Sequence, residues 1–120
     1  METMLQTKTK TILDHHVSAF LEADMEEIMK DFSEQSELLT PQGALKGTSD
    51  IRVFFEEIFK LIPKGSTLEL KQEIISDNIA YVVWASESIF ATIPLGTDTF
   101  IMEEDKIRYQ LLAAHIIPKQ

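Results

Sequence analysis

The sequence has 120 residues and a mass of 13.7 kDa, which supports one hydrophobic core, so we expect a single domain over residues 1–120. It contains no cysteine, which excludes disulfides and thiol chemistry. Eleven lysines and arginines against twenty aspartates and glutamates give a net charge of −9, so nucleic acid and anionic membranes are not expected partners. No apolar run approaches the roughly 18 residues of a membrane span, and residues 1–10 lack a signal-peptide core, so we expect a cytoplasmic protein.

The first half of the sequence predicts three helices. Apolar residues recur at helical spacing over residues 5–22, which indicates an amphipathic first helix. Asp24, followed three residues later by Glu27, has the form of a capping box and indicates a short second helix. The third helix is expected to begin at a capping Thr48 or Ser49, and its wide apolar face requires a covering layer.

The second half has the alternation of β-strands. Residues 68–74 alternate apolar and polar side chains, and Asp77-Asn78 then indicates a hairpin turn. Further strands are expected over residues 79–90, 97–102 and 107–117, besides a brief strand over 37–40 that a loop over 41–47 follows. Because helices and strands are segregated, we predict an α+β domain in which the N-terminal helices pack on one face of a curved, mostly antiparallel sheet.

This order of elements resembles the nuclear transport factor 2-like fold, also called SnoaL-like or cystatin-like α+β. The likeness is carried by Phe32 and by residues 17–24 (VSAFLEAD), 47–55 (GTSDIRVFF) and 104–107 (EDKI). The resemblance implies a cone whose internal pocket accepts small, mostly apolar molecules. The family includes steroid isomerases, polyketide cyclases, dehydratases and epoxide hydrolases beside proteins without a known reaction, so the resemblance implies a pocket and not a reaction.

The same resemblance assigns residues to the pocket. Steroid isomerases use a carboxylate base, a tyrosine and a protonated aspartate, and the matching positions here are Thr40, His16 and Asp98. A threonine hydroxyl cannot act as the base near neutral pH, so that reaction is not expected. His16 and Asp98 could still form an acid–base pair. The alternative is a structural His16 bonded to a backbone carbonyl and an Asp98 that faces solvent.

One strand carries two further expectations. Glu87 alternates with Tyr81 and Val83 on the face that the resemblance directs into the pocket, where burial would raise the pKa of the carboxyl and suit it to proton transfer. The alternative places Glu87 at the solvent-exposed rim. Trp84 then falls, with Val82, on the opposite convex face, through which we expect a homodimer. The residues expected to contact a ligand are Phe20, Thr40, Phe54, Phe55, Phe59, Tyr81, Val83, Phe100, Gln110 and Leu112.

The motifs of several common sites are missing. The three histidines lack the spacing of a metal site, and we expect His15 at the surface and His115 on the outer face of the last strand. The sequence has neither a glycine-rich phosphate loop nor the elbow of a serine hydrolase. We therefore expect neither a metal nor a cofactor.

These observations favour a homodimeric protein that binds a small apolar or mixed-polarity molecule. One alternative is an isomerase, cyclase or dehydratase in which His16 and Asp98 move a proton, Glu87 assists, and Thr40 or Gln110 orients the substrate. Another is an interaction module whose pocket is filled by its own side chains. An open pocket with a hydrogen bond between His16 and Asp98 would favour the enzyme, an open pocket without that bond the binding protein, and a filled pocket the module.

Overall fold

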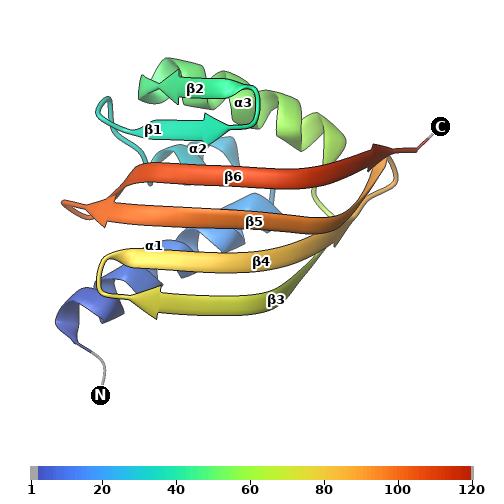
Figure 1. Cartoon of the computed structure of the whole chain (residues 1–120). Coiled ribbons are helices and arrows are strands. Elements are labelled where there is room, and N and C mark those ends of the chain that lie inside the picture. Colours follow the sequence, from blue (N-terminus) through green and yellow to red (C-terminus); the bar gives the residue numbers. More distant parts are fainter. Residues whose placement is uncertain (1–2, 120) are drawn as a thin grey trace.

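Helices cover one side of a curved sheet (Figure 1). The computed structural model describes residues 3–119, and its elements in chain order are α1 (Met4–Leu21), α2 (Met25–Met29), β1 (Glu37–Thr40), β2 (Gly43–Lys46), α3 (Gly47–Leu61), β3 (Thr67–Ser76), β4 (Ile79–Glu87), β5 (Ala91–Glu103) and β6 (Lys106–Pro118). The strand order is β2-β1-β6-β5-β4-β3, in which β1 and β6 run parallel and the other neighbours antiparallel. The expected α+β architecture is confirmed.

Helices α2 and α3 begin differently from the sequence-based expectation. Asp24 caps α2 by accepting the backbone N–H of Glu27 (3.1 Å), but the Glu27 side chain turns toward α1 and does not complete a capping box. Helix α3 begins at Gly47, so the prediction of a cap at Thr48 or Ser49 is wrong. Gly47 has a φ of 82°, which glycine adopts without strain, and this lets the chain pass directly from β2 into the helix.

Two stretches that the sequence patterns placed outside strands belong to the sheet. The expected loop over 41–47 contains β2, which folds back on β1 and pairs Thr40 with Gly43. Strand β5 begins six residues before the expected residue 97, at Ala91. Its first half contains Pro94 and Gly96, which usually interrupt a strand, but here the strand registers shift around them.

Strand β4 turns the opposite face inward from the one expected. Its buried residues are Ala80, Val82, Trp84 and Ser86. Its exposed or half-buried residues on the other face are Ile79, Tyr81, Val83, Ala85 and Glu87. The assignment of Trp84 to the convex face is therefore wrong, since the indole is 7% exposed and lies on the helix side. The cause is that both faces of β4 carry apolar residues, so alternation alone does not say which face is inside.

The core lies between the helices and the concave face of the sheet. Its most deeply buried large side chains are Leu13, Ile28, Leu38, Ile51, Phe55, Ile93 and Ile107. They come from all three helices and from three strands, so packing holds the helical layer against the sheet. No helix within residues 3–119 is long and apolar enough to cross a membrane.

Candidate ligand-binding site

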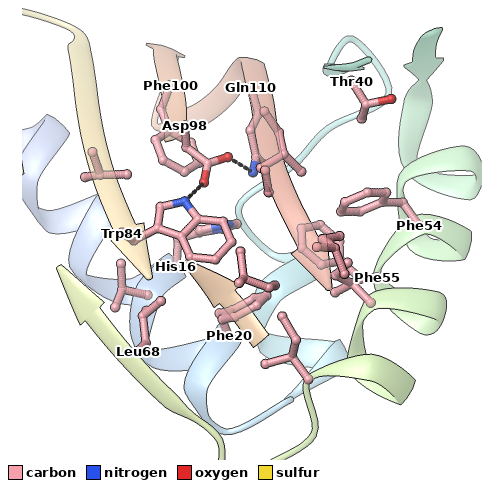
Figure 2. A pocket seen from close by; sticks show the side chains of 18 of the residues that line it. His16, Phe20, Thr40, Phe54, Phe55, Leu68, Trp84, Asp98, Phe100 and Gln110 are labelled. Carbon is pink, nitrogen blue, oxygen red and sulfur yellow. Dashed lines mark hydrogen bonds between the residues drawn. The ribbon is translucent and has the colours of Figure 1, made fainter. Parts of the chain in front are cut away.

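A cavity of about 160 Å³ lies between the helices and the concave face of the sheet (Figure 2). Its walls are mainly apolar and include Phe20, Phe54, Phe55, Leu68, Val82, Phe100 and Leu112. An engineered cavity of roughly 150 Å³ holds benzene, whereas pockets for drug-sized molecules start near roughly 300 Å³. The space therefore suits a molecule with a single ring.

Asp98 supplies the buried charge of this cavity. It projects from β5 toward the helices and is 8% exposed. The indole Nε1–H of Trp84, on β4, donates to its Oδ2 (2.8 Å), and the amide nitrogen of Gln110, on β6, donates to its Oδ1 (2.9 Å). Three neighbouring strands thus fix the carboxylate, which does not face solvent as the alternative interpretation had it.

The pKa of Asp98 is raised because the side chain is buried. Removal from water raises it to about 6, against the lowering effects of the Gln110 hydrogen bond, the nearby His16 and the Trp84 hydrogen bond. The carboxyl therefore titrates close to neutral pH and is mostly ionised at about pH 7.

His16 reaches the same cavity from α1. Its ring is 5% exposed and makes edge-to-face contacts with Phe32, Phe55 and Phe100, with centroids 5.1 to 5.9 Å apart. Within residues 3–119, no hydrogen bond joins His16 to Asp98, and the Nδ1 of His16 has no hydrogen-bond partner at all. The two predicted residues therefore border one cavity without forming a bonded pair.

Behind His16 lies a carboxylate that the sequence analysis did not single out. Asp31, whose side chain is 9% exposed, has its Oδ2 3.5 Å from Nδ1 of His16 and its Oδ1 2.7 Å from Nδ1 of His15. The other ring nitrogen of His15 is 3.0 Å from Glu27, and this hydrogen bond is the main reason why the pKa of His15 is raised. His15 is 36% exposed at its side chain, so it links the buried Asp31 to the surface. The available signal was an acid two residues after α2, next to the apolar Phe32.

Glu87 lies outside the cavity. It is exposed at the end of β4, where it pairs with Lys119 and accepts a hydrogen bond from Thr92 (3.0 Å). Both contacts lower the pKa of Glu87, and the contact with Lys119 has the larger effect. The expectation of a desolvated carboxyl with a raised pKa is wrong, because Glu87 lies on the outer face of β4 and not on the face toward the cavity.

The other expected ligand contacts divide into two groups. Phe20, Thr40, Phe54, Phe55, Phe100, Gln110 and Leu112 border the cavity, and their part in binding stays a prediction. Tyr81 and Val83 lie on the outer face of β4, and Phe59 packs behind Phe20 and Phe55, with ring centroids 5.7 and 5.8 Å away. The cavity residues that the sequence analysis missed include Trp84, Val82 and Leu68.

The positions of Thr40, of His115 and of the possible metal ligands limit the chemistry of the site. Thr40 lies at the β1–β2 turn, where its hydroxyl donates to the carbonyl of Gly43 (3.2 Å) and accepts the backbone N–H of Gln42. His115 is exposed on β6, beside Leu95 of β5. In the part of the chain that the structure describes, no three histidine or carboxylate side chains are placed to hold a metal ion.

The structure is similar to solved proteins with the nuclear transport factor 2-like, or SnoaL-like, fold. A nuclear transport factor 2-like protein of unknown function from Mesorhizobium loti has a TM-score of 0.80 and 12% identity over 96% of this chain and 97% of its own. A protein from Kribbella flavida that is provisionally assigned as a ketosteroid isomerase has a TM-score of 0.76 and 13% identity over 95% and 82%. A de novo designed protein with a curved β-sheet has a TM-score of 0.77 and 15% identity over 91% and 86%.

The chain therefore has the nuclear transport factor 2-like fold, as its sequence predicted. Neither a protein-family model nor a curated protein matches the sequence. Because identities of this size show the fold alone, function has to be argued from the residues of the cavity.

Proposed function

We propose that the protein binds a small, largely apolar molecule of about one ring in the cavity between helices and sheet. The observation that carries this proposal is the cavity itself, with apolar walls and a buried carboxylate held by Trp84 and Gln110. Pockets for small ligands have this composition, in which apolar walls supply affinity and a few fixed polar groups orient the ligand.

The energetics of Asp98 support a binding role over a purely structural one. A buried ionisable group reduces stability relative to an apolar residue of similar size, as its raised pKa reflects. A chain that needed only a packed core would be more stable with an apolar side chain at this position. The interaction module, whose pocket would be filled by side chains, is not favoured by a cavity of about 160 Å³.

Proton transfer is the second candidate function. A carboxyl whose pKa is about 6, with the imidazole of His16 near enough to affect it, suits acid–base chemistry near neutral pH. This favours an isomerase, cyclase or dehydratase over other enzyme classes. The lack of a hydrogen bond between His16 and Asp98 makes binding without reaction the first candidate.

Two adjacent alanines allow a matched test. Ala114 borders the cavity, whereas Ala113 lies on the outer face of the same strand. Ala114→Leu should fill part of the cavity and weaken binding of ring-sized probes such as toluene by about tenfold or more, as measured by ligand-detected NMR. Ala113→Leu should bind them like the unmodified protein. Equal binding by both variants would place the ligand elsewhere and contradict the proposal.

We also propose that two copies associate through the outer face of the sheet. Ile74, Tyr81 and Leu111 are 50, 38 and 39% exposed there. Ile74 pairs with Tyr81, and Thr99 joins Tyr81 to Leu111, so they form one uncharged row across four strands. A second copy of the same face would remove this apolar surface from water without opposing like charges.

The oligomeric state tests this second proposal. Tyr81→Glu should convert a dimer into a monomer in sedimentation equilibrium, since it places a charge in the middle of the row. Gln35→Glu, an exposed loop change that adds the same charge, should leave the dimer intact. A protein that is monomeric without substitution, at about 100 μM, would contradict the proposal.

A further inference from the structure

The polar end of the cavity is built mainly from hydrogen-bond acceptors. Each carboxylate oxygen of Asp98 receives one N–H, from Trp84 and from Gln110. An ionised carboxylate accepts about four hydrogen bonds, so each oxygen retains room for one more donor. Asp98 can therefore receive a donor from a bound molecule without losing either contact.

Gln110 adds a second acceptor to this end of the cavity. Its amide nitrogen faces Asp98, and this orientation is required because the reverse one would place two oxygens against each other. Its amide oxygen is consequently buried without a hydrogen-bond partner among the described residues. Buried polar atoms are normally paired, so this oxygen favours a donor within reach.

Few donors are available to balance these acceptors. The indole of Trp84 has a single N–H, and it is used by Asp98; the hydroxyl proton of Thr40 is used by the carbonyl of Gly43. The remaining side-chain donors are the second amide hydrogen of Gln110, the imidazole of His16 and the amide of Gln42, which is exposed at the β1–β2 turn. None of the residues that line the cavity is a lysine or arginine, so no fixed cation neutralises Asp98.

We infer that the molecule bound in this cavity presents a hydrogen-bond donor, a hydroxyl or an ammonium group, to Asp98, and that a carbonyl compound of the same shape binds more weakly. A carbonyl oxygen would face the oxygens of Asp98 and Gln110 without donating to either of them, so the Gln110 oxygen would stay unpaired and the carbonyl would gain no hydrogen bond from them. A hydroxyl would pair with one of them, and an ammonium group would also neutralise the buried charge. The inference rests on the proposed function, because it needs the cavity to be the binding site.

Four probes of nearly equal size test it. Cyclohexanol, cyclohexylamine and cyclohexanone differ only in the polar group, and toluene supplies a ring without one. We expect the alcohol, the amine or both to bind at least about tenfold more tightly than the ketone at about pH 7.5, measured by NMR titration or by fluorescence of Trp84, the single tryptophan. Whichever donor binds more tightly identifies the class.

Asp98→Asn tests the assignment to this residue. It removes the charge and keeps the shape, so the preference for donor over ketone should fall about tenfold. Glu87→Gln, which removes an exposed carboxylate outside the cavity, should preserve the preference. If Asp98→Asn does not fold, the ranking of the four probes on the unmodified protein still decides.

The outcomes separate this inference from the proposed function. A ketone that binds as tightly as the alcohol and the amine, or more tightly, overturns the inference and leaves the cavity as the binding site. An unchanged preference in Asp98→Asn overturns the role of Asp98. Failure of all four probes to bind, toluene included, overturns the proposed function and the inference with it.

Discussion

Asp98 carries a cost in stability that depends on pH. Burial raises the pKa of its carboxyl from 3.8 to about 6, so between these values the folded protein binds more protons than the unfolded chain. The free energy of unfolding should therefore fall as pH rises through this window. Since one pKa unit is worth about 1.4 kcal/mol, the contribution of Asp98 is about 3 kcal/mol.

Asp98→Asn should remove that dependence. Urea unfolding at about pH 4 and pH 7 should show a decline that is about 2 kcal/mol smaller in the variant than in the unmodified protein, because part of the effect is already expressed at pH 4. The other titrating groups are common to both proteins and cancel in the difference. Identical declines in the two proteins would mean that Asp98 does not titrate in this window.

His15 contributes to stability at low pH, and its contribution, like that of Asp98, makes the free energy of unfolding fall as pH rises. Its pKa is raised first by the hydrogen bond to Glu27 and then by the charge and hydrogen bond of Asp31, so its stabilising effect is full below pH 6.5 and is lost as pH rises through the folded pKa. Glu27→Gln should lower the pKa of His15, as followed by NMR titration of the imidazole. Glu26→Gln, a change at the adjacent exposed glutamate, should leave that pKa unaltered.

At the scale of the secondary-structure elements, β4 and β5 pack closely against each other beside the cavity. Gly96 pairs with Trp84, and a Cβ at Gly96 would lie 2.4 Å from the indole. Gly96→Ala should therefore displace the indole and break its hydrogen bond to Asp98, with a loss of about 1–3 kcal/mol in urea unfolding and a shift in tryptophan emission. Thr97→Ala, a neighbouring change on the outer face, should leave the emission unchanged. An unshifted emission in Gly96→Ala would show that the indole does not lie against this position.

The same pair of strands shows where sequence patterns stop being informative. The first half of β5 contains Pro94 and Gly96, which usually interrupt a strand, and the expected strand began only at residue 97. Gly96 is nevertheless required within β5, because the indole of Trp84 lies against it. In β4, Val82 and Val83 are equally apolar, so hydrophobicity did not distinguish inside from outside. For strand β6 the expected residues Gln110 and Leu112 border the cavity.

At the scale of the whole molecule, the fold followed from the order of its elements, whereas the site did not. Segregated helices and strands limit the chain to few architectures, and the structure has the expected one. The contacts of Asp98 depend on residues from three strands and on bulges that shift their registers. Such long-range geometry leaves no local pattern in the sequence. His16 and Asp98 were named only through the family resemblance, whereas Trp84 was placed on the wrong face and Asp31 was not singled out.

The cavity should also set the stability of the molecule as a whole. Empty volume reduces stability by about 24 cal/mol per Å³, so about 160 Å³ corresponds to at most about 4 kcal/mol. Ala114→Leu should recover part of this, about 1 kcal/mol in urea unfolding, while it weakens ligand-induced stabilisation. Ala113→Leu, on the outer face, should do neither. A destabilised Ala114→Leu variant would mean that the cavity has no room for the added methyl groups. A variant that is more stable but no longer stabilised by ligand would show that the open cavity reduces stability and is needed for binding.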